Sequence, residues 1–159
     1  MAQLTNGGKK LSPSIFYNNL SKKNEHSETV IADPKYLKII QRGLDEATND
    51  LGGTSYYSRI RGKYEFGGKT GTSQVRVISS KEREEGLIKN EDLPWEKRDH
   101  GLFIGYGPIS KPQYSVSVIV EHGGSGSGTA APIASDVFKQ SGKIDAKWPS
   151  LPIPNTAKS

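Results

Sequence analysis

Residues 69–72 read Lys-Thr-Gly-Thr and combine an ammonium group, two hydroxyl groups and one position without a side chain. Ammonium and hydroxyl groups donate hydrogen bonds, and donors grouped in this way suit an anion. The sequence on both sides is rich in aromatic and β-branched residues, at positions 64–66 and 75–78. Such residues favour strands, so we expect this run to be extended.

The geometry of a strand decides how these groups are presented. Successive side chains point to opposite faces, so Thr70 and Thr72 are expected on the same face. Gly71, which lies between them, would let another backbone or a ligand approach closely. A polar edge strand on which Lys69 discourages aggregation is the alternative without a binding role. The four residues therefore predict an anion-binding strand, and neighbouring motifs must support it.

The composition indicates one globular domain with a modest core. The chain has 159 residues, of which 33% are apolar, and a formal net charge of +5. Its basic residues are dispersed, so nucleic acid is not an expected partner. Cysteine is absent, which excludes disulfides and thiolate metal sites. The histidines, His26, His100 and His122, lack ligand spacing, so we expect neither a metal nor another cofactor.

The first helix and the first connection can be placed from local signals. Asp33-Pro34 has the pattern of a capping residue followed by proline at the first helical position, and predicts a helix that continues to about Asn49. The strand at Lys69 follows. The stretch 79–99 is rich in charge of both signs and is expected to be a solvated connection with at most a short helix.

Two further strands and a closing helix complete the expected order. The continuous apolar run 101–107 suits a strand covered on both faces, and the alternating run 114–121 follows it so closely that we expect a hairpin. After a glycine-serine turn, a helix is expected over residues 129–140 and is expected to end at Gly142. The order indicates an α+β fold, with a domain over residues 1–142 and an irregular, proline-rich tail over residues 143–159.

Two motifs suggest nucleotide binding, but each lacks a required part. Gly68-Lys69-Thr70 resembles the end of a phosphate-binding loop, yet position 63 is lysine where glycine is needed, and no helix is expected after it. Residues 126–131 match the dinucleotide-binding pattern, yet no apolar strand follows the next helix. A nucleotide-binding module using residues 126–131 and a noncatalytic α+β module both remain alternatives.

Together the motifs resemble the penicillin-binding transpeptidases. The resemblance rests on Lys-Thr-Gly-Thr-Ser-Gln-Val at 69–75, on Asp-His-Gly-Leu-Phe-Ile-Gly-Tyr-Gly-Pro at 99–108, and on Glu-His-Gly-Gly-Ser-Gly at 121–126. The last two features are most similar to the class B group called penicillin-binding protein 2, which serves bacterial cell elongation. The similarity covers roughly residues 1–140 and corresponds to the C-terminal part of the transpeptidase domain.

The resemblance implies a β-lactamase/transpeptidase-like fold, in which this chain supplies three C-terminal strands of an antiparallel sheet covered by helices, including a C-terminal helix. It implies a serine-type D,D-transpeptidase whose cleft is lined by Ser-x-x-Lys, Ser-x-Asn and Lys-Thr-Gly motifs. Only the third motif is present in this chain. Tyr17-Asn18-Asn19 imitates a variant of the second, but it lies too near Lys69 in the sequence for this family.

Site roles follow from the resemblance position by position. It assigns Lys69 to polarising the cleft, and Thr70 and Thr72 to the carboxylate of a peptide or a β-lactam. Gly71 would let the substrate backbone lie along the strand. The backbone N–H of Thr72 would form half of an oxyanion hole, and the other half would come from a serine that this chain lacks. None of the nucleophile or base residues of the family's motifs is present in this chain, so we expect the isolated chain to be inactive.

The resemblance also implies partners and a location. We call the complete transpeptidase, of which this chain would be a part, the parent protein. Its expected partners are the peptidoglycan stem peptide, β-lactams and a glycosyltransferase, and its expected location is the outer, periplasmic face of the bacterial inner membrane. This chain shows no signal sequence and no membrane anchor. The strand at 114–121 would lose a neighbour that upstream sequence supplies, so we expect self-association through that sheet edge.

Overall fold

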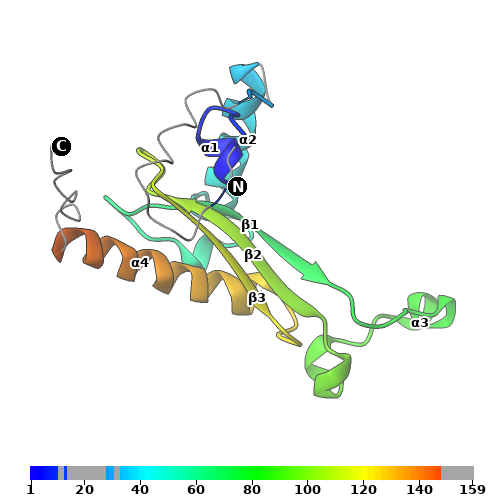
Figure 1. Ribbon diagram of the computed structural model, residues 1–159. Helices are drawn as coiled ribbons and strands as arrows, with labels where there is room; N and C mark the ends of the chain where they lie inside the picture. The colour runs from blue at the N-terminus through cyan, green and yellow to red at the C-terminus, as the bar shows by residue number, and fades with distance from the viewer. Residues whose placement is uncertain (11–12, 14–27, 31–32, 148–159) are drawn as a thin grey trace, which may run out of the picture.

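The computed structural model describes residues 1–10, 13, 28–30 and 33–147, and the elements lie in these ranges. Its helices are α1 (Ala2–Thr5), α2 (Pro34–Asn49), α3 (Ser80–Glu85) and α4 (Ala131–Lys147), and its strands are β1 (Gly67–Ser73), β2 (His100–Gly107) and β3 (Tyr114–Val120). Figure 1 shows α4 running alongside the sheet, and the connection with α3 extending away from it. A leading helix, three antiparallel strands and a closing helix confirm the predicted α+β fold.

Helix α2 begins and ends where its local signals predict. The side chain of Asp33 accepts a hydrogen bond of 2.8 Å from the N–H of Lys35, and Pro34 occupies the first turn. Leu37, Leu44 and Thr48 are buried along one side of the helix. The other residues of α2 are exposed or half-buried, and the exposed ones include the apolar Tyr36, Ile39 and Ile40, so the helix packs through a narrow stripe.

The three strands form one antiparallel sheet in the order β1-β2-β3. Strands β2 and β3 form the predicted hairpin, with Phe103 opposite Val118. Along β3 the valines at 116, 118 and 120 are half-buried and residues 115, 117 and 119 are exposed, so the predicted alternation is confirmed. In the described part of the chain β3 pairs only with β2, and self-association through its outer edge stays a prediction.

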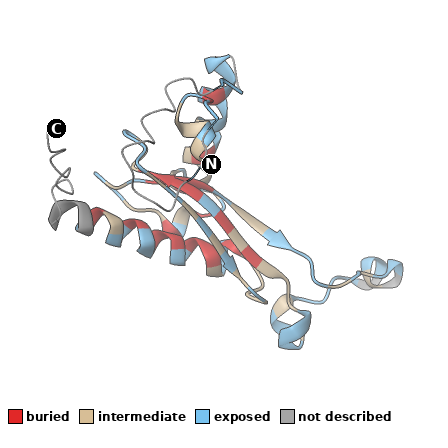
Figure 2. Ribbon diagram, viewed as in Figure 1, coloured by how far each residue is buried: buried red, intermediate tan, exposed pale blue. Residues whose placement is uncertain are grey.

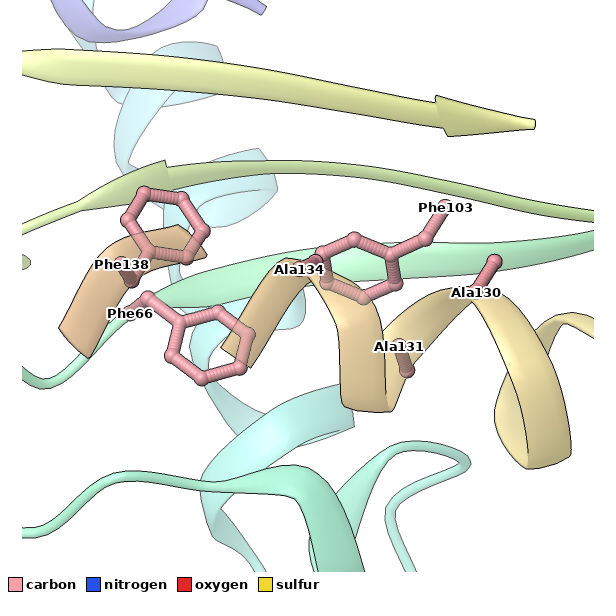
Figure 3. Packing of buried hydrophobic residues seen from close by; sticks show 6 residues of the cluster. All are labelled: Phe66, Phe103, Ala130, Ala131, Ala134 and Phe138. Carbon is pink, nitrogen blue, oxygen red and sulfur yellow. The ribbon is translucent and has the colours of Figure 1, made fainter. Parts of the chain in front are cut away.

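The core lies between α4 and the sheet face that carries Phe103 (Figure 3). The ring of Phe66 stacks on Phe138 with centroids 4.8 Å apart and meets Phe103 edge-on at 5.9 Å. Alanines at 130, 131 and 134 are buried on the facing side of α4, and their small side chains let the helix lie close to the strands. Figure 2 shows the buried residues concentrated along this interface.

The opposite face of β2 is covered only in part, so the expectation of a strand covered on both faces is wrong. Ile104 on that face is 45% exposed, whereas Tyr106 is buried. Gly67, the partner of Tyr106, lies against α2, so this helix covers only that end of the strand. Burial and the nearby carboxylate of Asp45 raise the pKa of the Tyr106 hydroxyl.

Helix α4 does not end at Gly142 but continues to Lys147. A Cβ at Gly142 would lie 2.7 Å from ring atoms of Tyr64. The glycine therefore lets the Tyr64 ring pack directly against the backbone of α4. Sequence alone cannot tell a packing glycine from a terminating one. The expected irregular tail therefore does not begin at residue 143, and residues 148–159 lie outside the described part of the chain.

The glycine-serine turn before α4 is a π-helical turn, Gly126–Ala130, that crosses the sheet. Gly126 lies against the backbone of two strands, because a Cβ there would be 2.3 Å from the carbonyl oxygen of Leu102 and 2.4 Å from that of Gly71. A backbone atom cannot move aside as a side chain can, so no residue with a Cβ fits at this position without displacing a strand.

The connection from residue 74 to residue 99, which we call the arm, is held by polar contacts. Arg76 and Glu82 form a two-pronged ion pair, and the carboxylate of Glu82 also lies 3.4 Å from the N–H of Ile88. Hydrogen bonding from Arg76 lowers the pKa of Glu82. The expected solvated connection with a short helix is therefore present as α3, but ion pairing fixes its course.

We predict that Gly126→Ala lowers the free energy of unfolding by about 1–3 kcal/mol, because the added methyl group overlaps two strand carbonyls. Gly43→Ala is the matched control, since Gly43 lies inside α2 with nothing within 4 Å of the new methyl group. This control should raise stability by up to about 1 kcal/mol through helix propensity. Denaturant midpoints measure both, and similar midpoints for the two variants would contradict the close backbone contact.

The Arg76–Glu82 pair should make the arm sensitive to acid. Because the pKa of Glu82 is lowered in the folded chain, its stabilising contribution is present above the unfolded pKa of about 4.3 and is lost as pH falls through the lower folded value. Carbon NMR titration of the Glu82 carboxyl group should show a higher midpoint in Arg76→Gln than in the unaltered chain. Equal midpoints in the two proteins would show that the ion pair does not form in solution.

Candidate functional site

The Lys69–Thr72 run lies on β1, at the edge of the sheet. Thr70 is opposite Phe103 and Thr72 is opposite Gly101, so the two threonines share the face that carries α4. Lys69 lies on the other face, but its Nζ donates a 2.8 Å hydrogen bond to the carbonyl oxygen of Thr70. The ammonium group therefore stays beside the strand edge, 3.5 Å from the Thr70 hydroxyl oxygen.

Helix α2 fixes the start of this strand. Gly67 sits so close to α2 that a Cβ there would be 3.2 Å from the carbonyl oxygen of Leu44. One turn further on, the amide of Asn49 donates to the carbonyl oxygen of Phe66 at 3.0 Å and to the carboxylate of Asp45 at 2.8 Å. The strand thus enters the site from an anchored position.

Gly71 is approached by the chain itself. The backbone of Gly126 lies beside it on the face that carries Thr70 and Thr72, and the requirement for a missing Cβ falls on Gly126. A Cβ on Gly71 would meet only the side chain of Leu102, at 3.2 Å. The close backbone approach expected at this glycine is therefore present, and its partner is the turn before α4.

Sequence analysis missed Thr54, whose side chain is hydrogen-bonded to the site from outside β1. The hydroxyl group of Thr70 donates to that of Thr54 at 3.0 Å, although 16 residues separate them. No pattern in the sequence relates the two positions. Only Gly52-Gly53, which indicate a turn after α2, hint that the chain reverses there.

Thr54 also lies at the rim of a hollow of about 630 Å³ between the loop after α2 and the start of α4. Its lining includes hydroxyl groups from both segments and the side chains of Arg59, Asp136 and Lys139. Arg59 is held above the ring of Tyr56, 3.6 Å from the centroid, and donates to its carbonyl oxygen. The hollow therefore adjoins the strand without including Lys69.

The histidines of the described chain serve local structure. Nδ1 of His100 accepts a 2.9 Å hydrogen bond from the N–H of His122, and Nδ1 of His122 lies 3.0 Å from the carbonyl oxygen of Arg98. Their rings pack 4.8 Å apart. No group of three metal-binding side chains occurs among the residues that the structure describes. His26 and the Tyr17-Asn18-Asn19 run lie outside the described residues.

The dinucleotide-like run at 126–131 is used within the fold. Ser125 caps the turn, since its hydroxyl accepts from the N–H of Gly128 at 3.1 Å and its carbonyl accepts from the N–H of Thr129 at 3.1 Å. The strands are antiparallel and no strand follows α4 among the described residues. The unit of strand, helix and parallel strand that this motif needs is therefore absent there.

Comparisons by sequence identify a matching family and relatives over most of the chain. Residues 1–139 match the family described as penicillin binding protein transpeptidase domain. The peptidoglycan D,D-transpeptidase MrdA of Salmonella typhimurium is 32% identical over 146 residues, which cover 87% of this chain and 23% of the relative. MrdA of Acinetobacter baumannii is 42% identical over 76 residues, covering 47% of this chain and 10% of the relative. The chain thus spans less than a quarter of these proteins.

Solved structures show the same fold. A complex of penicillin-binding protein PBP2 and MreC from Helicobacter pylori matches 91% of this chain and 23% of its own, with a TM-score of 0.66 and 24% identity. Pseudomonas aeruginosa PBP2 in complex with WCK 5153 matches 76% of this chain and 21% of its own, with a TM-score of 0.50 and 31% identity. This chain belongs to the penicillin-binding protein transpeptidase domain family.

Proposed function

We propose that this chain forms the Lys-Thr-Gly wall of a peptidoglycan D,D-transpeptidase cleft and binds the carboxylate of a stem peptide or a β-lactam. The observation that carries the proposal is the arrangement of Thr70 and Thr72 on one face of an edge strand, with the ammonium group of Lys69 held beside the first. Two hydroxyl donors and a cation at one edge match the needs of a carboxylate.

The free edge of β1 supports a place for the substrate backbone. In the described chain β1 pairs with β2 on one side only, so its other edge can accept an extended peptide as an added strand. The backbone N–H of Thr72 would then supply half of an oxyanion hole.

The chemistry of the parent reaction requires groups from elsewhere. A serine oxygen would attack the carbonyl carbon of the donor peptide, the C–N bond to the terminal D-alanine would break, and the acyl group would pass from serine to an acceptor amine. No serine of this chain has lysine three positions later, and no asparagine has serine two positions before it. We therefore propose that this chain contributes binding, and that a separate segment contributes the nucleophile.

The setting of the parent protein follows from its relatives. The family match ends at residue 139, which supports residues 1–142 as part of one transpeptidase domain. We propose a periplasmic location and a glycosyltransferase partner for the parent, as expected of an enzyme that acts on peptidoglycan. Among the described residues no helix combines the length and apolar character that a membrane span requires.

Carboxylate recognition can be measured on the chain itself. A peptide ending in D-alanyl-D-alanine should bind about tenfold more tightly as the free acid than as the C-terminal amide, because hydrogen bonds to a charged group contribute roughly 1.5–3 kcal/mol. Thr70→Val and Thr72→Val should each remove most of this preference, whereas Ser115→Ala, an exposed hydroxyl on β3, should leave it unchanged. NMR titration gives the Kd values, and equal binding of acid and amide would contradict carboxylate recognition.

The absent nucleophile gives a separate prediction. Incubation of the chain with a labelled penicillin should yield no covalent adduct, because opening of the lactam ring requires an activated serine in the cleft. Mass spectrometry of the intact chain checks this, with a complete penicillin-binding protein treated in parallel as the positive control. A stable mass increase on any peptide of the chain would show that it carries a nucleophile of its own.

A further inference from the structure

The hydrogen bond between Thr54 and Thr70 joins the loop after α2 to strand β1. Thr54 lies in the loop after α2, and Thr70 lies in the middle of β1. Their hydroxyl oxygens are 3.0 Å apart, with Thr70 as the donor. The ammonium group of Lys69 approaches the Thr70 hydroxyl from another direction, at 3.5 Å. The proposed carboxylate donor is therefore held by two neighbours.

The loop that carries Thr54 is fixed by the residues on both sides of it. A Cβ on Gly53 would be 2.6 Å from the carbonyl oxygens of Glu46 and Ala47, so this residue lies directly on the end of α2. The N–H and the hydroxyl of Ser55 both donate to the carbonyl oxygen of Ala47, at 3.0 and 3.1 Å. Ser55 is 2% exposed, so these hydrogen bonds are shielded from water.

The same helix holds both members of the pair. A second buried hydroxyl, that of Thr48, lies 3.2 Å from Ser55 and extends the network into α2. Asn49, the next residue, ties the helix to the start of β1 through the carbonyl oxygen of Phe66. Because loop and strand are both attached to the last turns of α2, the separation of Thr54 from Thr70 is set by a rigid element.

Counting hydrogens shows what the pair does for an anion. Each hydroxyl has one hydrogen to donate, and one of the two is used between Thr54 and Thr70. In the observed pair the free hydrogen is that of Thr54, whereas the hydrogen bond restrains the Thr70 side chain and its hydroxyl. If the bond reverses when an anion binds, Thr54 donates to Thr70 and Thr70 donates to the anion. A threonine without this neighbour would have to order its hydroxyl at the moment of binding.

We propose that Thr54 is a positioning residue that holds the Thr70 side chain in the rotamer from which its hydroxyl can donate to the carboxylate of the substrate. This role rests on the proposed carboxylate recognition and names the residue that prepares its donor. Thr54 acts through Thr70, so it differs from a residue that merely supports the fold and from one that contacts the carboxylate on its own. The distinction can be measured.

The first test needs no ligand. Three-bond couplings from the methyl carbon of Thr70 to its own backbone report its side-chain rotamer in the free chain. The unaltered chain and Thr54→Ser should show a single rotamer, and Thr54→Val, which keeps the shape without the hydroxyl, should show averaging. Thr54 is exposed, so the variants should retain the denaturant midpoint of the unaltered chain, and Thr54→Ala provides a second version of the deletion. An unchanged single rotamer in both Thr54→Val and Thr54→Ala would overturn the proposal.

The second test is a double-mutant cycle with the D-alanyl-D-alanine peptide acid. Thr54→Val should weaken binding about three- to tenfold, an effect of the size expected for a lost neutral hydrogen bond, and Thr54→Ser should restore it. In a Thr70→Val background, Thr54→Val should have no further effect, because the group it orients is gone. Equal losses in both backgrounds would overturn the proposal. Equal binding of acid and amide by the unaltered chain would instead refute carboxylate recognition, and the rotamer measurement would still decide whether Thr54 orients Thr70.

Discussion

The close contact between the last turns of α2 and two glycines is the constraint on which the arrangement of the site depends. Gly67 and Gly53 each lie against backbone carbonyls of α2. Gly67 is at the start of β1, and Gly53 is in the loop that follows α2. A Cβ at Gly53 would overlap two carbonyl oxygens of α2, and a Cβ at Gly67 would force strand or helix to shift by a few tenths of an ångström. Since the helix is rigid over its 16 residues, it transmits one fixed geometry to both segments. The absence of side chains at Gly53 and Gly67 therefore helps to set the distance between Thr54 and Thr70.

Packing on the other side of the sheet follows a similar logic. Helix α4 approaches the strands through alanines, and a Cβ at Gly107 on β2 would lie 3.2 Å from the ring of Phe138. Small residues bring the helix close, and three phenylalanines fill the space that remains. The π-helical turn that begins with Gly126 continues this close packing up to Gly71. The site strand is thus held by backbone contacts from both layers.

Local signals in the sequence predict most of the elements, but not the end of α4 and not the contacts between elements. The cap at Asp33, the hairpin of β2 and β3 and the alternation along β3 all follow from neighbouring residues, and the structure confirms them. Gly142 was read as a helix end because a packing glycine has the same local signature. The contact of Thr54 with Thr70 spans 16 residues and depends on how loop and strand attach to α2, which no local pattern encodes. The roles proposed for Lys69–Thr72 rest on the resemblance, because a group of hydrogen-bond donors indicates an anion without naming the ligand.

The carboxylate of Asp99 closes the arm at its base. One oxygen accepts from the N–H of Val75 at 3.3 Å and the other from the amide of Asn90 at 3.1 Å, while its own carbonyl binds the N–H of Gly124. The Val75–Asp99 hydrogen bond therefore joins the two ends of the arm, and Asn90, within the arm, is tied to the same carboxylate. The entropy of closing a loop grows only slowly with its length. Changes in length between the residues that form the Arg76–Glu82 and Asn90–Asp99 contacts should consequently cost little in the register of β1 and β2, because the link from Val75 to Asp99 keeps the two ends of the arm together.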